Sequence, residues 1–388
     1  MVIPTMGTDY IVNLLLELVK IDTNSLERKN YNQIVELISR EAEKIGCVVK
    51  RIVDSKGIPH LKITLPRAPK NAKRIVFLTH YDVVPPGEGW SFDPFSPFIK
   101  DGKLFGRGAS DNKSSIAAGL GAFKEIIEEG INPRVYPILI VAGGEETGES
   151  AEFFRSIQGD VAVVLDVGPE GLSIGASGAV RGEVVVKGKQ SHSAYPYRGI
   201  NAIYQAFKLV KFLEEYGKKL EETIRSKYAA PEHYDRVPAR LNVTMIKGGV
   251  APNIIPAECE ITIDRRTIPE EKAETVAREL KEKIEEFASK NEIEVEVKTK
   301  ALIDAWVTKN EEIIGKFREI LKEIMGEDPR IVVELGGTDG VHLIDRMPVI
   351  QFGALRSENN IHGKDEFVYI KDLIVVKDFI KKVILTEF

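Results

Sequence analysis

The sequence predicts an α/β protein in which a mixed, mostly parallel sheet is flanked by helices and a smaller α+β domain is inserted. Three observations predict this fold class. Short apolar runs without polar alternation follow helical patterns in the first 177 residues, as buried parallel strands do. After residue 177 the pattern changes to segments in which apolar and polar residues alternate. Continuous apolar runs return after residue 300. We therefore expect one domain formed by residues 1–177 and 301–388, with residues 178–300 inserted into it.

The first half is expected to alternate helices with buried parallel strands. Apolar residues at 3.6-residue spacing predict helices over 9–20 and 31–46. Two more helices are expected at about 114–129 and 148–157. The β-branched apolar runs predict strands at 61–65, 74–79, 138–143 and 161–166.

The inserted segment is expected to follow the order strand, helix, strand, strand, helix, strand. The alternating segments GEVVVKG, LNVTMIKGG and ECEITIDRR predict half-solvated antiparallel strands. A charged helix over 269–289 and a strand over 292–297 follow. Apolar runs at 330–335 and 347–353 and a helix from about residue 370 then complete the first domain.

Composition and charge exclude several classes of protein. The 388 residues include 54 Lys and Arg against 59 Asp and Glu, a net charge of -5, which argues against binding to nucleic acid or anionic lipid as the main function. No apolar run reaches the length of a membrane span, and we expect no targeting leader at the N-terminus. Cys47 and Cys259 are too few for a disulfide framework. We therefore expect a soluble, cytoplasmic protein.

Polar residues that can hold a metal follow the apolar strands. Open α/β sheets bind ligands at the carboxyl ends of their strands, so these residues are expected to lie together. Several carboxylates and two imidazoles in one place require cations to neutralise them, and oxygen and nitrogen donors without sulfur suit zinc, cobalt or manganese. Positions two apart on a strand face the same way, so Asp82 can orient the ring of His80. The candidate ligands are His80, Asp111, Glu145, Glu146, Asp166 and His362.

Each of these residues also has a structural explanation when taken alone. Asp111 is well placed to cap a helix beginning near Ser114, and Glu145-Glu146 can face the dipole of the next helix. An isolated aspartate such as Asp166 is usually a turn residue. Their joint occurrence at successive strand ends favours a metal site. The segment GRGASDNKSS is not a phosphate loop, because Asn112 stands where a glycine must precede the lysine.

At these residues the sequence resembles the co-catalytic metallopeptidase family. Its members include glutamate carboxypeptidase, acetylornithine deacetylase, succinyl-diaminopimelate desuccinylase, aminoacylase and several dipeptidases. The resemblance is ordered and covers nearly the whole chain. It rests on the segments HYDVVPPGEGW (80–90), GRGASDNK (106–113), GGEETG (143–148), VLDVGP (164–169), GKQSHSAYP (188–196), GGVAPNIIPAECEITIDRR (248–266), GGTDG (336–340) and IHGKDE (361–366).

The resemblance implies two divalent metal ions in each subunit, zinc first and cobalt or manganese as alternatives. His80 and Asp166 would hold one ion, Glu146 and His362 the other, and Asp111 would bridge them. Asp82 would support His80, Glu145 would be the general base, and the Asp111-Asn112 peptide bond would be cis. The inserted domain would be a lid that carries a homodimer contact. Its site residues would be His192, which reaches the partner's active site, and Asn253 and Arg266, which bind the carboxylate of the substrate.

The expected function is hydrolysis of peptides or N-acyl amino acids. Two cations activate a water molecule and polarise the amide carbonyl, while Glu145 accepts the proton of the water and delivers it to the leaving amine. One alternative is a dedicated biosynthetic deacylase for acetylornithine, acetyl-lysine or succinyl-diaminopimelate. Asp166 counts against it, because deacylases and carboxypeptidases of the family usually have Glu there, whereas dipeptidases and aminopeptidases usually have Asp. A third alternative is a non-catalytic metal-binding protein on the same scaffold.

Overall fold

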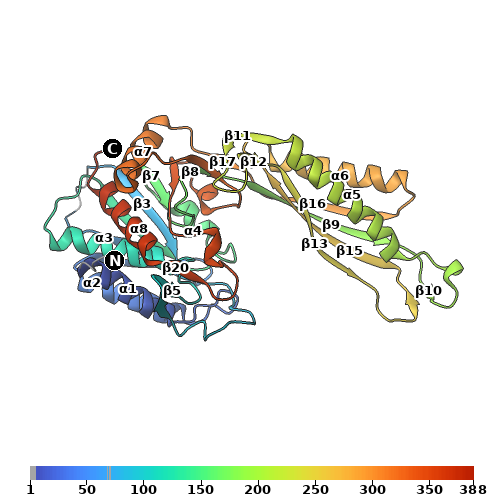
Figure 1. Ribbon diagram of the computed structural model, residues 1–388, viewed down its shortest axis with the longest axis horizontal. Helices are drawn as coiled ribbons and strands as arrows, with labels where there is room; N and C mark the ends of the chain where they lie inside the picture. The colour runs from blue at the N-terminus through green and yellow to red at the C-terminus, as the bar shows by residue number, and fades with distance from the viewer. Residues whose placement is uncertain (1–5, 68, 70) are drawn as a thin grey trace. The chain divides into compact units, whose positions relative to one another are not determined.

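The structure, a computed structural model, describes residues 6–67, 69 and 71–388 and consists of two compact units (Figure 1). The first unit comprises residues up to 174 together with 308–331 and 342–388, and the second comprises 175–307 and 332–341. The second unit therefore reaches beyond the expected limits of 178–300. One reason is pairing: β17 (Trp306–Val307) pairs with β8 (Leu172–Ala176), and β18 (Ile331–Glu334) pairs with β11 (Arg225–Ala229).

The centre of the first unit is formed by six successive strands of a larger sheet, in the order β1-β2-β6-β3-β7-β19. In that order the strands span Val48–Val53, Pro59–Thr64, Tyr136–Ala142, Arg74–His80, Val161–Val164 and Val349–Gln351. The last four are mutually parallel, which confirms the predicted fold class. The prediction of a parallel strand at 61–65 was wrong, because β2 is antiparallel to both of its neighbours. The apolar sequence of β2 indicates that both faces of the strand are covered. It does not indicate whether the strand is parallel or antiparallel to its neighbours.

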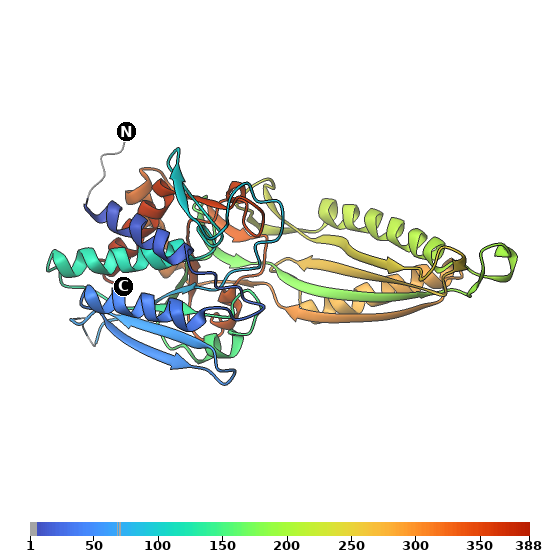
Figure 2. The same cartoon turned by 90° about the horizontal axis from the view of Figure 1, so that it is seen from below.

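Helices cover both faces of this sheet. Gly119 of α3 lies against the side chain of Leu139 in β6, whereas Phe153 of α4 lines a pocket together with Ile138 and Ile140 on the opposite face. In Figure 2, α1 and α3 lie side by side, and α3 also packs against α8. Covering on both faces explains why β3 and β6 lack polar alternation. The helices are α1 (Met6–Val19), α2 (Tyr31–Lys44), α3 (Lys113–Glu128), α4 (Ala151–Ser156), α7 (Glu311–Met325) and α8 (Ile370–Ile384).

The strand β1 and the helix α7 were not predicted. In β1 no residue is fully buried, so it lacks the apolar run by which the other strands were found. The helix α7 has clear local signals at both ends. The side chain of Asn310 accepts a hydrogen bond from the N–H of Ile313 at 3.0 Å, and Gly326 ends the helix with a φ of 77°.

A small antiparallel sheet brings the C-terminal segment beside the segment that precedes α3. Its strand order is β20-β5-β4, formed by Phe367–Tyr369, Lys103–Phe105 and Phe98–Lys100. Phe105 pairs with Phe367 across it, and Phe92 and Trp90 pack in the same aromatic cluster. The sheet therefore places residues 362–366, just before β20, next to residues 106–111, just after β5.

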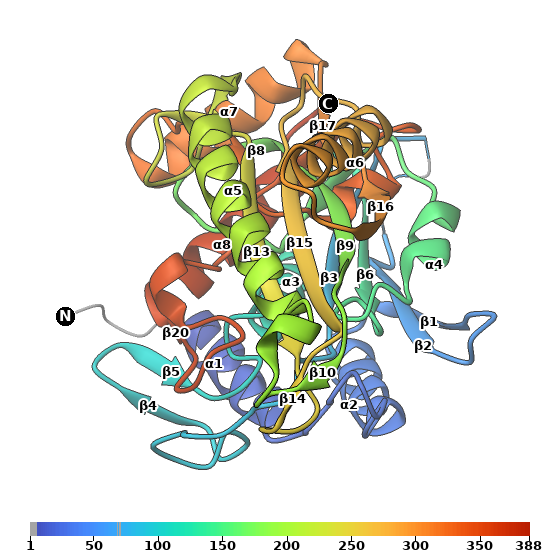
Figure 3. The same cartoon turned by 90° about the vertical axis from the view of Figure 1, so that its right-hand side faces the viewer.

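The second unit contains a four-stranded antiparallel sheet with the order β13-β15-β9-β16. These strands span Arg240–Gly248, Glu258–Thr267, Gly178–Lys187 and Val295–Ile303. The helices α5 (Ala202–Thr223) and α6 (Ala273–Lys290) lie side by side on one face (Figure 3). Buried and less buried residues alternate along β9 and β15, as predicted for half-solvated strands. The remaining strands are β10 (Ser191–His192), β12 (Arg236–Pro238) and β14 (Ile254–Ile255).

Of the helices that the structure describes, none combines the length and the apolar character that crossing a lipid bilayer requires.

Candidate metal centre

Four of the six candidate ligands lie at or shortly after the ends of three neighbouring parallel strands. The strand β3 ends at His80, and Asp166 comes shortly after β7. Gly143-Gly144 and then Glu145-Glu146 follow β6. Because β6, β3 and β7 are adjacent and parallel, their carboxyl ends meet at one edge of the sheet. The other two ligands come from outside the sheet, with Asp111 just before α3 and His362 before β20.

Asp111 lies between the two imidazoles. Its Oδ1 is 3.0 Å from Nε2 of His80, and its Oδ2 is 3.1 Å from Nε2 of His362. The same nitrogen of His362 is 3.1 Å from Oε2 of Glu146. One carboxylate thus presents one oxygen to each imidazole.

Two further carboxylates approach the His80 side. Nε2 of His80 is 3.6 Å from Oδ1 of Asp166 and 3.7 Å from Oε2 of Glu145. Ligand atoms of His80, Asp111 and Glu146 lie within 4.8 Å of one another, and so do those of His80, Glu145 and Asp166. The structure therefore brings together all six candidates named from the sequence, in two groups that share His80.

The side chains fit divalent metal ions. Nε2 of His80 is buried, its hydrogen-bonding geometry is not satisfied among the described residues, and it faces carboxylate oxygens, so its lone pair is available to a cation once its proton is lost. Donor atoms that share one tetrahedral zinc at ~2.1 Å are ~3.4 Å apart. The separations around His80 and His362 are 3.0–3.7 Å. Carboxylate oxygens and imidazole nitrogens are also the donors that zinc, cobalt and manganese accept.

Without a cation, the cluster retains protons on its imidazoles. Burial opposes a charge on His80, but the surrounding carboxylates, first Glu145, outweigh it and raise the pKa of the ring well above its usual value. Hydrogen bonds to Asp111 and Glu146 raise the pKa of His362 to about 10. Burial would raise the pKa of Asp111, yet the two imidazoles reverse this and lower it. Burial raises the pKa of Glu146 to about 6, although His362 opposes the change. Metal binding here must therefore displace protons.

Asp82 supports the centre differently from the expectation. The nearest acceptor to Nδ1 of His80 is the main-chain carbonyl of Asp82 at 3.0 Å, and the Asp82 carboxylate is 3.6 Å away. This carbonyl accepts the Nδ1 proton, so the Nε2 lone pair faces the other ligands. The carboxylate of Asp82 accepts hydrogen bonds at 3.2 Å from the main-chain N–H groups of Glu145 and Glu146. It therefore holds the segment that carries the proposed base and one ligand.

The turn at Asp111 is shaped by its neighbours. The Asp111-Asn112 peptide bond is cis, as the resemblance implies. The residue that precedes α3 is Asn112, so the alternative in which Asp111 caps this helix does not hold. The side-chain amide of Asn112 donates a hydrogen bond to Oδ1 of Asp166. This contact between two parts of the site was not predicted.

The three predicted substrate-binding residues all lie in the second unit. His192, in β10, and Asn253 are neighbours, because the N–H of Ser193 donates to the carbonyl of Asn253 at 3.0 Å. Arg266 lies at the other end of the unit's sheet, paired in register with Ala179. Its Nε donates to Oδ1 of Asp264 at 2.8 Å. The structure thus brings two of the three together within the unit.

Besides Asn112, three buried residues that support the ligand segments were absent from the set predicted from the sequence. Arg107 and Glu366 form a fully buried ion pair of 2.7 Å, and the side chain of Asn359 donates to Oγ of Ser110 at 2.8 Å. Arg107 and Glu366 belong to the segments GRGASDNK and IHGKDE, which were identified from the sequence, but neither residue was named as part of the site. Nothing in the spacing indicated that residues so far apart in the chain would meet.

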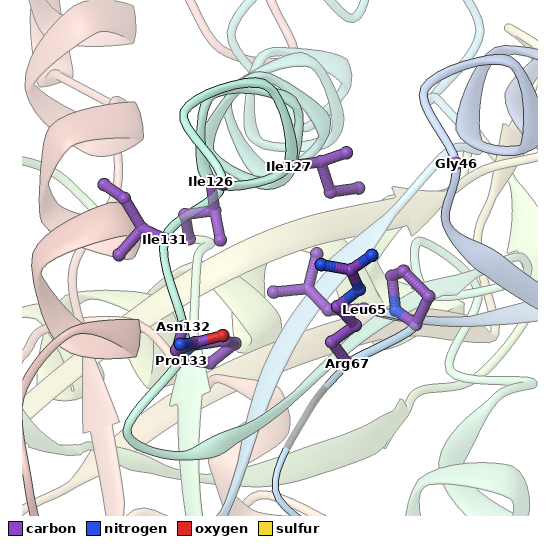
Figure 4. Close-up of a pocket in the computed structure, with 10 residues that line it drawn as sticks. Gly46, Leu65, Arg67, Ile126, Ile127, Ile131, Asn132 and Pro133 are labelled. Carbon is purple, nitrogen blue, oxygen red and sulfur yellow. The ribbon is translucent and has the colours of Figure 1, made fainter.

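A separate cavity of about 330 Å³ opens on the first unit near the end of α3 (Figure 4). Its lining is mainly apolar, with Leu65, Ile126, Ile127 and Ile131, and its charged group is Arg67. It contains neither a carboxylate nor an imidazole among its lining residues. The cavity is therefore unsuited to metal chemistry, and the strand ends remain the candidate active site.

Carboxylates and imidazoles gathered at the strand ends of an α/β sheet are suited to a metal-dependent enzyme. Residues 76–386 match peptidase family M20/M25/M40, and the chain belongs to this family. It is a metal-dependent hydrolase that acts on amide C–N bonds of peptides or N-acyl amino acids.

Relatives and solved structures cover nearly the whole chain. The chain is 28% identical to a succinyl-diaminopimelate desuccinylase of Cereibacter sphaeroides over 370 residues, 91% of this chain and 93% of the relative. It is 29% identical to an uncharacterised metallohydrolase of Methanocaldococcus jannaschii over 350 residues, 83% of each. Its fold is similar to that of a tripeptidase from Staphylococcus aureus, with a TM-score of 0.79, 21% identity and 97% of both chains covered.

Proposed function

We propose that this protein hydrolyses short peptides with two divalent metal ions, held by His80 and Asp166 on one side and Glu146 and His362 on the other. The observation that carries the proposal is the position of Asp111, whose two oxygens face the two imidazoles at 3.0 and 3.1 Å. A carboxylate so placed is suited to bridging two cations. Zinc is the first choice, and cobalt and manganese suit the same donors.

When bound, two such cations lower the pKa of a water molecule toward neutrality and polarise the carbonyl of the scissile amide. The protein supplies the proton transfers. Glu145 lies beside His80, its side chain is 20% exposed, and the Asp82 carboxylate holds its main chain. We assign Glu145 as the general base that takes the proton of the attacking water. It then delivers this proton to the departing amine.

Asp166 favours a peptidase over a deacylase. By resemblance, peptidases that act on dipeptides or free N-termini usually have Asp at this position, whereas deacylases usually have Glu. The competing candidate is a deacylase of N-acyl diamino acids, which is favoured by the 28% identity with a succinyl-diaminopimelate desuccinylase. A substrate panel separates the two candidates, because a peptidase cleaves many dipeptides and tripeptides, whereas a dedicated deacylase prefers one N-acyl diamino acid.

The test uses protein stripped of metal and reloaded with Zn²⁺, Co²⁺ or Mn²⁺. Release of amine from dipeptides, tripeptides, N-acetyl amino acids and N-succinyl diamino acids is then measured under the same conditions. We expect hydrolysis of short peptides by the reloaded protein and none by the stripped protein. If one N-acyl diamino acid is strongly preferred over all other substrates, the protein is the competing candidate, a dedicated deacylase. No hydrolysis of any amide by fully loaded protein would refute both.

We also propose that the protein is a homodimer formed through the second unit. The helix α5 exposes Tyr204 (70%) and Phe207 (68%), and β13 exposes Met245 (66%). The two elements pack together, and β13 is an edge strand of its sheet. Exposed apolar side chains beside an edge strand are suited to contact with a second copy of the chain. Replacing Phe207 by Asp should produce a monomer in sedimentation analysis, and an unchanged mass would contradict the proposal.

His192 is the second-unit residue that we propose acts across this dimer. The N–H of Ala194 donates to Nδ1 of His192 at 3.1 Å, which leaves a proton on the exposed Nε2. Such an N–H group can stabilise the negative oxygen that develops on the substrate carbonyl. Mixing inactive His192→Ala subunits with inactive Glu145→Gln subunits should restore part of the activity. Absence of any recovery in verified mixed dimers would contradict this role.

Asn253 and Arg266 remain our candidates for binding the carboxylate of the substrate. Replacing either residue by Ala should raise KM more than it lowers kcat. The reason is that binding at the far end of a substrate is similar in the ground state and the transition state. We place the protein in the cytoplasm, since Cys47 and Cys259 are both free and buried, as in proteins of reducing compartments.

A further inference from the structure

Glu366 lies at the centre of a buried network that joins two segments of the first unit. Its side chain and that of Arg107 are 0% and 1% exposed, and they form an ion pair of 2.7 Å. Glu366 comes four residues after the candidate ligand His362, and Arg107 comes four residues before the candidate ligand Asp111. The pair therefore joins the two segments that supply ligands from outside the central sheet.

The carboxylate of Glu366 accepts four hydrogen bonds, two on each oxygen. Oε1 accepts from the main-chain N–H groups of Ser110 at 2.9 Å and Asp111 at 3.1 Å. Oε2 accepts from the N–H of Gly108 at 3.0 Å and from Nη1 of Arg107 at 2.7 Å. One carboxylate thus holds the whole turn from 107 to 111, including the main chain of Asp111.

The network also reaches the segment that carries His362. Nη2 of Arg107 donates to the carbonyl of Gly363 at 2.8 Å, directly after this histidine. The main-chain N–H of Gly106 donates to the carbonyl of Glu366 at 2.9 Å. His362 has a positive φ of 60°, so its backbone conformation depends on such external support.

We propose that Glu366 is a positioning residue that fixes Asp111 and His362 at the separation two metal ions require. The proposal rests on the metal centre of the proposed function and adds a residue to it. Glu366 acts through these ligands, since its own oxygens are occupied by the four donors. Its role parallels that of Asp82, which holds the main chain of Glu145 and Glu146 on the other side of the centre.

Replacing Glu366 by Gln tests the network sharply. A glutamine offers one acceptor oxygen and one NH₂ group, so in either orientation its NH₂ faces two donors. Two hydrogen bonds are lost, and buried donors are left without partners. Loss of a partner that orients metal ligands typically lowers metal affinity about 10–100-fold. Replacing Glu366 by Asp keeps the charge on a shorter side chain, so a smaller loss is expected.

A matched control separates positioning from general stability. Glu125 on α3 is a half-buried carboxylate that accepts hydrogen bonds from Lys377 and Lys381 and lies in no ligand segment. Its Gln variant also removes the charge from a carboxylate that binds lysines. We expect Glu125→Gln to lower thermal stability without changing metal affinity.

The experiment measures metal binding by the full chain. Stripped wild-type protein and the three variants are titrated with Co²⁺, followed by visible absorbance, and with Zn²⁺, followed by calorimetry. We expect affinity to fall about 10–100-fold in Glu366→Gln, less in Glu366→Asp and not at all in Glu125→Gln. Equal affinity of Glu366→Gln and wild type would overturn the proposal, whatever the change in melting temperature. If Glu366→Gln does not fold, Glu366→Asp decides, and affinity within twofold of wild type refutes the role. A wild type that binds no metal would instead refute the proposed function.

Discussion

Replacing Glu145 by Gln removes one negative charge from the metal centre and leaves the size of the side chain unchanged. The main-chain hydrogen bond from Glu145 to Asp82, at 3.2 Å, does not involve the altered group. The neighbouring candidate ligand Glu146 should therefore keep its place. What is lost is the group that we propose accepts a proton from water and returns it to the amine.

The expected result is a loss of turnover with little change in binding. General acid–base catalysis contributes about 10²–10⁴-fold, so kcat should fall by that factor. This factor corresponds to an increase of about 2.7–5.4 kcal/mol in the activation free energy. KM should change much less, because the variant removes an interaction made mainly in the transition state. The assay is steady-state hydrolysis of the best peptide substrate by protein loaded with metal.

Metal content must be measured in the same samples, because the geometry allows a second role. Oε2 of Glu145 is 3.7 Å from Nε2 of His80, and Glu145 forms a possible ligand group with His80 and Asp166. If Glu145 is the general base, the Glu145→Gln variant should still bind two metal ions. If Glu145 is a metal ligand, the variant should bind one. Glu149→Gln is the matched control, since Glu149 is in the same segment and pairs with Arg28 at 2.6 Å. We expect its activity to stay within about twofold of wild type, because an exposed ion pair contributes only ~0.2–1 kcal/mol to stability.

Two outcomes would refute the reasoning. A kcat near the wild-type value in Glu145→Gln would remove Glu145 from the proton transfers. A variant that loses both activity and one metal ion would make Glu145 a ligand, and the base would have to be sought elsewhere.

Three further predictions concern metal, pH and packing. Removing the metal with a chelator should abolish hydrolysis and lower the melting temperature, because a ligand at 100 times its Kd stabilises the folded state by about 2.7 kcal/mol; an unchanged melting curve would contradict a structured metal centre. Burial lowers the pKa of His60, although Asp54 opposes the change, so its contribution to stability is present above the usual pKa and is lost as pH falls below about 6.5. The free energy of unfolding of the stripped protein should therefore fall between pH 7 and 5 more steeply in wild type than in His60→Gln, and equal slopes would count against it. Phe379 is fully buried against Phe317 and Phe352, so Phe379→Ala should cost about 3–5 kcal/mol in denaturant unfolding, whereas a cost below 1 kcal/mol would show that the core refills the space.

Much of the candidate site could be predicted because four of its residues follow strands. Buried strands have a strong local signal, so the polar residues that directly follow β3, β6 and β7 stood out. The adjacency of these parallel strands then follows the general rule for ligand sites in α/β sheets. Asp111 and His362 were named from the sequence with the other four, but they follow no strand of the central sheet: Asp111 precedes α3 and His362 precedes β20.

The supporting contacts could not be predicted. Whether Asp82 presents its carboxylate or its carbonyl to His80 depends on side-chain rotation, and the structure shows the carbonyl closer, at 3.0 Å. The hydrogen bond from Asn112 to Asp166 depends on how the turn before α3 meets the end of β7. Neither arrangement has a local pattern.

Sequence alone determined the fold class and the strand ends that carry His80, Glu145, Glu146 and Asp166. These features are local, because the apolar periodicity that indicates secondary structure and burial is a property of residues close together in the sequence. Tertiary structure alone decided the direction of β2, the place of Asp111 between two imidazoles and the network around Glu366. Glu366 and Arg107 are 259 positions apart, and no rule of spacing relates them. They meet because the small sheet β20-β5-β4 brings residues 362–366 beside residues 106–111, where the buried carboxylate accepts hydrogen bonds from four donors.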